Sequence, residues 1–336
     1  MFFDHRLNLL PDYTDIVWEN AVFDTNAKLS QLVYFLKNKF PSDQKICIID
    51  HISQVFDCVN TVNDSDMDLV IINASDHPLQ FDDIHAIKKP KIKLDFDFNK
   101  HDYHPWHILW SHWLANRDNT VDFTSPRQHD ISCLYVKSRI TRVYNITQLH
   151  QRSYFDKIYT VWCDKFETPE QLMHEDGLTA DDVRDCWQTY LSLEKGMPEI
   201  HLTEFESCQI LGKGYEDTYL NIVLEARIAD FGFLTEKICK PIRAGQLFLT
   251  QSSPGTIRYL RSIGFDTFDD YIDHDRYDLE LDWKKRTRLI HTVLDEIQPR
   301  LPEIFAMTVE RRQRNAEWLK NPELVTRLLK TAKVDK

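Results

Sequence analysis

The segment from residue 233 to residue 245 contains three polar residues in a row, Thr235-Glu236-Lys237, ahead of a stretch of mixed polarity that ends at Gly245. The spacing predicts a helix within residues 233–244, with Thr235 as a cap and Gly245 as its stop. A lysine is unusual in the first turn of a helix unless an anion binds there, and Glu236 is placed to accept hydrogen bonds from ribose hydroxyls. The pattern indicates a site for a nucleotide diphosphate. The alternative is an ordinary helix with a charged first turn.

The elements around this helix indicate an α/β fold. Strands are predicted at 131–136, 221–225 and 246–250, and helices at 140–150 and 254–262. In the first part of the chain, the continuous apolar runs 46–49 and 69–72 are typical of strands buried on both faces of a parallel sheet, while 92–98 alternates in polarity. Because a polar stretch ends at Ser125-Pro126, two βα domains are predicted at 1–125 and 126–300, followed by C-terminal helices at 301–336.

Composition excludes several classes of protein. All eight glycines lie at or after Gly177, and neither the dinucleotide-binding G-x-G-x-x-G nor the P-loop pattern occurs. No apolar run is long enough for a membrane-spanning helix, and the first residues do not resemble a secretory signal. Seven cysteines without a C-x-x-C pair indicate buried thiols in a reducing compartment. We therefore expect a cytoplasmic protein, in the cytoplasm of a host cell if a phage encodes it, with no membrane partner.

From about residue 130 to residue 300 the chain resembles the donor domain of two-domain (GT-B) glycosyltransferases. The resemblance rests on 221–225, on the Thr235-Glu236-Lys237 helix and on 254–268 with its Leu260-Arg261 and Gly264-Phe265 pairs. The motif is similar to the Thr-Glu-Lys signature of α1,3-fucosyltransferases, and closer to a group of largely bacteriophage-encoded proteins. The first 125 residues show no such match.

The resemblance implies a fold and a donor site. The fold would be GT-B-like, with two Rossmann-like βα domains facing a cleft, and the donor a UDP- or GDP-sugar acting as co-substrate without a further cofactor. Lys137, Arg139 and Arg142 match the family's basic turn after the first donor-domain strand, although Tyr135-Val136 replace its usual polar-glycine pair. Glu225 matches an acidic strand-end residue. For the two arginines the alternative is an exposed helix start, and for Glu225 an ordinary strand-end carboxylate.

Glycosyl transfer also needs charge neutralisation and often a general base. Lysines and arginines at the diphosphate would stabilise the leaving group, so we expect no metal. The alternative is a metal ion held by the carboxylates of Asp95-Phe96-Asp97 or of residues 64–68, since a hard cation prefers oxygen ligands. The same carboxylates could instead lie on the solvated face of a strand and in a solvated loop. A base would come from the first domain at the carboxyl end of a strand. The candidates are Asp50, His51, Asp76 and His77, each of which could instead be a turn or cap residue.

The acceptor is the least defined part of the site. The phage-type resemblance implies a hydroxymethylated pyrimidine in double-stranded DNA, whereas the net charge of −12 argues against DNA. One candidate acceptor contact is Trp106, which could stack on a base or sugar but also fits a core-facing helix stripe with Trp110 and Trp113. The other is the basic pair Arg311-Arg312, which could bind DNA or could be a solvated helix face. A glycan or protein hydroxyl is the alternative acceptor. A non-catalytic nucleotide- or DNA-binding protein of the same fold is the alternative function.

Overall fold

The computed structural model describes two compact units, residues 1–102 with 325–336 and residues 103–324, which are treated separately below. In the second unit the described residues are 121–134, 138–161, 166–172, 177–193, 213–226, 228 and 234–324. Elsewhere the structure describes the backbone of five strands in the first hundred residues and Arg327 near the C-terminus. Within these residues no helix is both long and apolar enough to cross a membrane.

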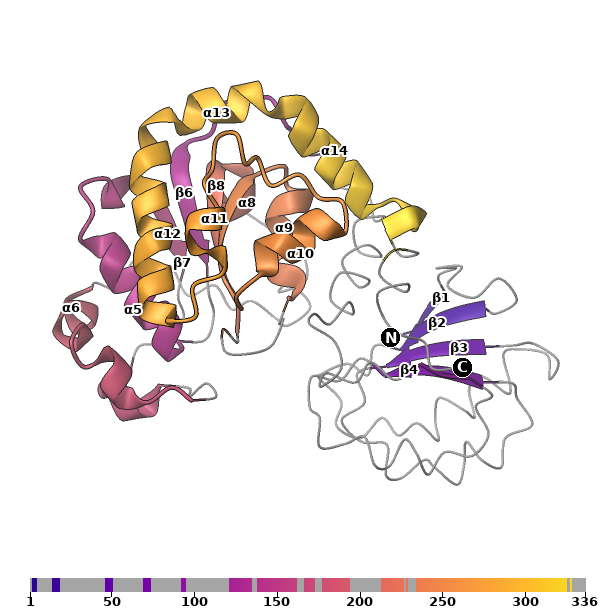
Figure 1. Cartoon of the computed structure of the whole chain (residues 1–336), viewed down its shortest axis with the longest axis horizontal. Helices are drawn as coiled ribbons and strands as arrows, with labels where there is room; N and C mark the ends of the chain where they lie inside the picture. The colour runs from indigo at the N-terminus through magenta and orange to yellow at the C-terminus, as the bar shows by residue number, and fades with distance from the viewer. Residues whose placement is uncertain are drawn as a thin grey trace. The chain divides into compact units, whose positions relative to one another are not determined.

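The first unit contains a five-stranded sheet in the order β1-β2-β3-β4-β5. Figure 1 labels the first four of these strands. Strands β2 to β5 are parallel, and β1 is antiparallel to β2. This confirms the parallel sheet predicted from the two apolar runs, which form β3 and β4, and the third predicted strand contains β5. The strand bounds are Phe2–Asp4, Thr14–Trp18, Ile46–Asp50, Leu69–Asn73 and Ile92–Leu94. Asp50 and Asn73 are paired at the carboxyl ends of β3 and β4.

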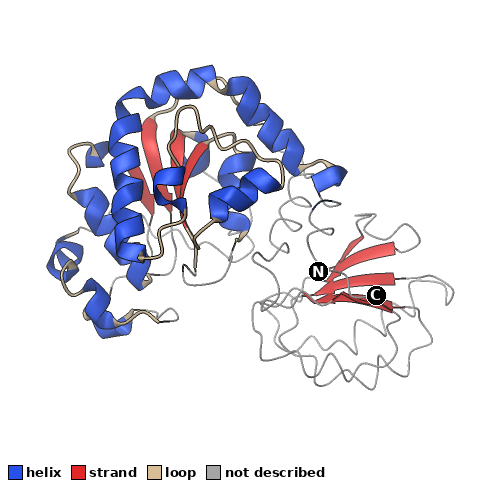
Figure 2. Ribbon diagram, in the orientation of Figure 1, coloured by secondary structure: helices blue, strands red, loops and turns tan. Residues whose placement is uncertain are grey.

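The second unit is built on a fully parallel four-stranded sheet in the order β7-β6-β8-β9. Figure 2 shows these strands as a central layer with helices around them. The strand bounds are His129–Leu134 (β6), Ile158–Val161 (β7), Thr218–Leu224 (β8) and Leu247–Gln251 (β9). Every residue of β8 and β9 is buried, as expected for strands of a parallel sheet covered on both faces.

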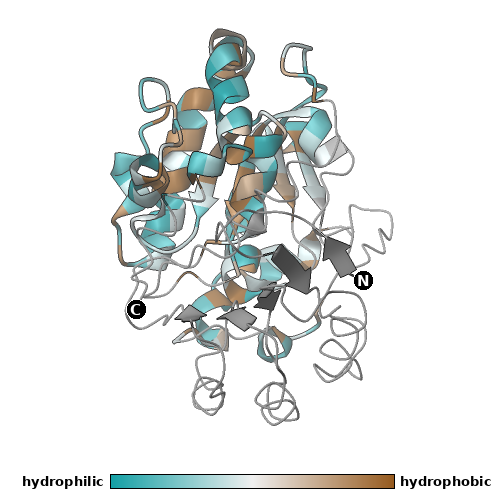
Figure 3. Ribbon diagram, turned by 90° about the vertical axis from the view of Figure 1, so that its right-hand side faces the viewer, coloured by the Kyte–Doolittle hydropathy of each residue, from teal (hydrophilic) through white to brown (hydrophobic). Residues whose placement is uncertain are grey.

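Helices follow the strands in the βα order that the apolar pattern predicts. Their bounds are Ile140–His150 (α5), Trp187–Ser192 (α6), Lys213–Glu216 (α8), Glu236–Arg243 (α9), Thr256–Ser262 (α10), Asp275–Asp278 (α11), Trp283–Ile297 (α12), Leu301–Met307 (α13) and Val309–Leu319 (α14). Short 3₁₀ turns lie at Phe155–Lys157, Pro169–Gln171, Ala180–Val183 and Gln298–Arg300. Figure 3 shows hydrophilic and hydrophobic residues alternating along these helices, as amphipathic helices on a sheet require.

Helices α12, α13 and α14 belong to the second unit, although the sequence pattern places 301–336 in a segment of its own. Helix α12 packs against α5 and β9, α13 against β8, and α14 against α9. The chain returns to the first unit at Val325. Residues 121–125 also lie in the second unit, because the backbone carbonyl of Phe123 accepts a hydrogen bond from Arg312 of α14 at 2.8 Å.

Gly245 ends α9 as predicted and explains one tight contact. Its φ of 66° is in the left-handed region that glycine adopts without strain. A Cβ at this position would lie 2.4 Å from the ring of Phe123. The glycine therefore turns the chain into β9 and leaves room for the ring of Phe123 beside it.

Candidate functional site

The carboxyl ends of β6, β8 and β9 lie at one edge of the second sheet. Leu134, Leu224 and Gln251 are the last residues of these strands, and α5, α9 and α10 begin after them. In open parallel sheets this edge is where ligands bind, because loops and helix N-termini gather there. Most of the residues predicted for donor binding come to this edge.

The clearest interaction at this edge joins Glu225, which follows β8, to Thr235, the residue before α9. The backbone N–H of Thr235 donates to Glu225 Oε1 at 3.0 Å, and its hydroxyl donates to Oε2 at 2.6 Å. Both residues are almost completely buried. Glu225 therefore closes the loop between β8 and α9 at its base. Its two carboxylate oxygens hold the helix start, and the donor-site role that the resemblance implies for Glu225 stays a prediction.

Thr235 caps α9 as predicted. Its Oγ1 accepts from the backbone N–H of Lys237 at 3.2 Å, and the Lys237 ammonium lies 3.2 Å from the same oxygen. Glu236 is the first residue of the helix, and its side chain lies outside what the structure describes. The positive end of the helix disfavours the lysine, while the buried carboxylate beneath Thr235 offsets part of that cost. An anion bound beside Lys237 would offset the rest.

Arg142 reaches the same edge from the first turn of α5. It is buried, and its Nη2 donates to the carbonyl oxygen of Leu224 at 3.1 Å, next to Glu225 in the chain. The alternative that Arg142 lies on an exposed helix start is therefore excluded. Arg139 is the N-cap residue of α5 and is partly exposed, and the first turn contains no acidic residue. Lys137 lies outside the described residues.

Polar side chains beneath the edge connect β9 to α5 and α12. Gln251 accepts from Asn145 Nδ2 at 2.9 Å and donates to Thr287 Oγ1 at 2.8 Å, and its carbonyl accepts from the backbone N–H of Glu225 at 3.1 Å. Cys133 lies within this layer, and burial raises its pKa to about 12. It therefore remains a thiol. The other described cysteines, Cys186 and Cys239, are also buried thiols, in agreement with the prediction for cysteines.

The start of α10 is already occupied by a carboxylate of the chain. Asp278 Oδ1 accepts from the backbone N–H of Ile257 at 2.8 Å and Oδ2 from that of Arg258 at 3.1 Å. The backbone N–H of Gly255 donates to the Asp278 carbonyl at 2.7 Å. Burial raises the pKa of Asp278, although the hydrogen bonds from the N–H groups of Ile257 and Arg258 lower it in part. The backbone N–H groups of Ile257 and Arg258 are therefore not available to an anionic ligand. No local sequence signal identifies this capping role.

The candidate bases belong to the first unit. Asp50 is the last residue of β3, at the carboxyl end of a parallel strand as predicted. His51, Asp76 and His77 lie outside the described residues, as do Trp106 and the carboxylates at 64–68, 95 and 97. The roles of all these residues stay predictions.

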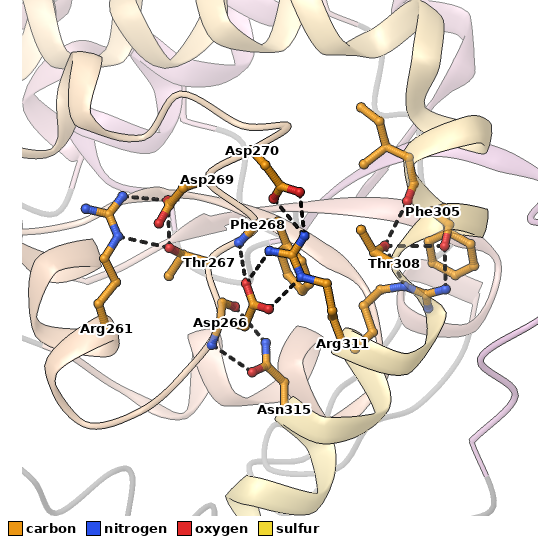
Figure 4. A network of polar contacts seen from close by, with 12 residues as sticks. Arg261, Asp266, Thr267, Phe268, Asp269, Asp270, Phe305, Thr308, Arg311 and Asn315 are labelled. Carbon is orange, nitrogen blue, oxygen red and sulfur yellow. Dashed lines mark hydrogen bonds and ion pairs between the residues drawn. The ribbon is translucent and has the colours of Figure 1, made fainter.

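Arg311 and Arg312 of α14 both bond other parts of the second unit, and Figure 4 shows the contacts of Arg311. Arg311 donates to Asp266 Oδ2 and Oδ1 at 2.6 and 2.7 Å and to Asp270 Oδ1 at 2.7 Å. Arg312 is 1% exposed and donates to the carbonyl oxygens of Gly245 and Phe305 at 2.6 and 2.7 Å. Both guanidinium groups form hydrogen bonds within the second unit, because the side of α14 that carries them packs against other elements of that unit. Arg312 lies in the interior and not on the surface track that its sequence neighbourhood predicts.

Comparisons with known proteins provide a distant structural likeness only. No family model matches the chain, and no curated protein matches it. The chain is similar to the crystal structure of α,α-trehalose 6-phosphate synthase from Burkholderia multivorans, with 9% identity and a TM-score of 0.42 over 91% of this chain and 76% of that one. It is also similar to an apo structure of OtsA, with 8% identity and a TM-score of 0.40 over the same shares. What this chain binds is therefore inferred from its own residues.

Proposed function

We propose that this protein is a nucleotide-sugar-dependent glycosyltransferase of the GT-B type, with its donor site at the starts of α5 and α9. The observation that carries the proposal is the start of α9, where Thr235, Glu236 and Lys237 follow a buried Glu225 at the carboxyl edge of a parallel sheet. Arg142 reaches the same edge, and the start of α10 is filled by Asp278. These cations would place positive charge beside a diphosphate without a glycine-rich loop.

The proposed reaction moves one sugar to a hydroxyl. The acceptor oxygen forms a bond to the anomeric carbon of the donor, while the bond from that carbon to the β-phosphate oxygen breaks and its electron pair stays on the nucleoside diphosphate. Lys237 and Arg139, with Lys137, would stabilise the charge that develops on the leaving group. Glu236 would accept hydrogen bonds from the ribose hydroxyls.

The acceptor proton would pass to a base in the first unit. Asp50 stands at the carboxyl end of β3, the position from which a base is expected, and His51, Asp76 and His77 remain its alternatives. A carboxylate or imidazole needs hydrogen-bond reach to the acceptor hydroxyl in the bound complex. Loss of transfer in Asp50→Asn with unchanged donor affinity would assign this role to Asp50.

The acceptor class is proposed from the phage-type resemblance, as 5-hydroxymethyl-pyrimidine in duplex DNA. Because Arg311 and Arg312 contact the protein itself, DNA binding would have to use other cations, among which Arg314 and Lys320 are exposed. A glycan or protein hydroxyl is the alternative, and it agrees better with the acidic net charge. Sugar transfer to hydroxymethylated DNA, compared with transfer to oligosaccharide and protein acceptors, separates the two.

A panel of UDP- and GDP-sugars tests the donor assignment first. A ligand that binds the folded chain raises its apparent stability by about 2.7 kcal/mol at a concentration 100 times its dissociation constant. We expect one nucleotide class to raise the melting temperature and to release its nucleoside diphosphate when an acceptor is present. Stabilisation without any turnover would favour the non-catalytic alternative, and no stabilisation by any member would reject the proposal.

A further inference from the structure

Arg286 is a buried arginine in the first turn of α12 that no sequence motif identifies. Its side chain is 2% exposed. Nη2 donates to the carbonyl oxygen of Ile228 at 2.9 Å, and Nη1 donates to that of Glu280. One guanidinium group thus connects the loop that follows β8 to the loop that precedes α12.

Each of these two loops holds the start of one helix at the carboxyl edge of the sheet. The loop after β8 contains Glu225, whose carboxylate holds Thr235 at the start of α9. The loop before α12 follows directly on Asp278, the last residue of α11, whose carboxylate accepts from backbone N–H groups in the first turn of α10. Among the described residues, Arg286 thus joins the loop that leads to the start of α9 to the segment that holds the start of α10.

We propose that Arg286 is a positioning residue of the donor site, which fixes the start of α9 relative to α10 and so the place of Lys237. The proposal rests on the function proposed above. An arginine suits this role because its planar fork donates in two directions at once and keeps its charge when buried. A lysine at this position keeps the charge, but its compact ammonium on a flexible stem does not reproduce the fork.

Arg312 provides a matched control at the opposite end of β9. It is also almost completely buried, and it also donates to backbone carbonyls, those of Gly245, Phe305 and Phe123. Gly245 precedes β9, whereas the loops held by Arg286 lie at the carboxyl edge. Arg286→Lys and Arg312→Lys therefore remove the same kind of interaction from the two ends of the sheet.

The experiment compares the full-length wild type with Arg286→Lys and Arg312→Lys by three measurements. These are urea unfolding, calorimetric titration with whichever nucleotide sugar stabilises the wild type, and amide hydrogen exchange of peptides that cover α9 and α10. Both variants should lose stability. Only Arg286→Lys should weaken donor binding, by about ten-fold, the lower end of the loss seen when partners that orient metal-binding side chains are removed. Exchange at the starts of both α9 and α10 should accelerate in Arg286→Lys alone.

Three results would overturn the proposal. The first is an equal loss of donor affinity in the two variants, and the second is unchanged exchange at the helix starts in Arg286→Lys. The third is that neither Arg286→Lys nor Arg286→Gln yields folded protein while Arg312→Lys does, because the arginine would then support the whole fold. If the wild type binds no nucleotide sugar, the donor assignment fails, and hydrogen exchange alone decides whether Arg286 positions the two helix starts.

Discussion

The carboxylate of Glu225 accepts a hydrogen bond from the backbone N–H of Thr235 at one oxygen and from its hydroxyl at the other. The loop between β8 and α9 therefore begins and ends on one buried pair. The pair fixes the first turn of α9, which carries Glu236 and Lys237, and the Lys237 ammonium lies 3.2 Å from the Thr235 hydroxyl oxygen. Glu225 and Thr235 thus hold the helix start, whereas Glu236 and Lys237 are the proposed donor contacts. Substitutions of the two pairs can therefore test stability and donor binding separately.

Substitutions of Glu236 and Lys237 test donor binding directly. Glu236→Ala and Lys237→Ala should each weaken nucleotide-sugar binding, with a loss of about 1.5–3 kcal/mol if a charged hydrogen bond disappears. The fold should persist, because Glu236 opens the helix and Lys237 is only partly buried in its first turn. Calorimetric titration measures the affinity, and Lys240→Ala, in the last turn of the same helix, is the control. Unchanged affinity in both variants would remove the donor site from α9.

Substitutions of Thr235 test the capping pair. Thr235→Val removes the hydroxyl that caps α9 and bonds Glu225, and it should lower the free energy of unfolding by about 0.5–2 kcal/mol. Thr235→Ser keeps the hydroxyl and should retain most of the stability. Urea unfolding of the three proteins provides the comparison. Equal stability of the valine and serine variants would mean that the Thr235 hydroxyl contributes nothing.

Arg139 provides a cleaner test of diphosphate binding than Arg142, whose burial against the Leu224 carbonyl ties it to the fold. Arg139→Gln should weaken donor binding while leaving the unfolding free energy nearly unchanged. Arg152→Gln, beyond the other end of α5, removes a cation that pairs with Asp295 and should leave donor affinity unaltered. A double variant of Arg139 and Arg142 that folds and turns over at the wild-type rate would reject the role of both.

Two buried histidines predict a loss of stability in mild acid. Burial lowers the pKa of His274 to about 4 and that of His291 to about 3, so both are neutral in the folded state at pH 7. Between these folded-state pKa values and pH 6.5, the two histidines bind more protons in the unfolded chain than in the folded chain. The stability that depends on their neutral form is therefore fully present above pH 6.5 and is lost as the pH falls below it. Each histidine contributes a slope of up to about 1.4 kcal/mol per pH unit.

The two histidines differ in their contacts, and substitutions should differ accordingly. His274 lies between the Tyr277 hydroxyl at 2.6 Å and the Thr267 carbonyl at 2.9 Å, whereas neither ring nitrogen of His291 has a hydrogen-bond partner among the described residues. His291→Phe should reduce the pH slope with little loss at pH 7. His274→Phe should lower stability at every pH, because the buried Tyr277 hydroxyl and Thr267 carbonyl would each lose the histidine as a hydrogen-bond partner. Urea unfolding from pH 4.5 to pH 7.5 measures both, and an unchanged slope in His291→Phe would contradict its buried neutral state.

Metal independence is a separate prediction from the basic donor site. Transfer activity should persist in EDTA, since the cations of the protein would stabilise the diphosphate. The control adds Mg²⁺ or Mn²⁺ after chelation. Activity that disappears in EDTA and returns with either metal would favour Asp95 and Asp97 as ligands.

Short-range patterns were sufficient to predict most elements of the second sheet. The helix expected at 140–150 is α5, with the same bounds, and Thr235 caps α9 in the expected way. The predicted strands lie within a few residues of β6, β8 and β9. These features depend on apolar periodicity, capping residues and glycine stops, all of which act over a few residues and are visible in the sequence.

Contacts between distant residues decided the rest. A cluster of arginines in a sequence is compatible with a surface track, yet Arg311 pairs with Asp266 and Arg312 bonds the carbonyls of Gly245 and Phe123. Asp278 caps a helix that begins before it in the chain, and Arg286 joins two loops that no motif connects. The residue types alone determined that cations and carboxylates were present at these positions. The fold decided which of these charged side chains form hydrogen bonds inside the protein, because it brings particular groups of distant residues within hydrogen-bond distance of them.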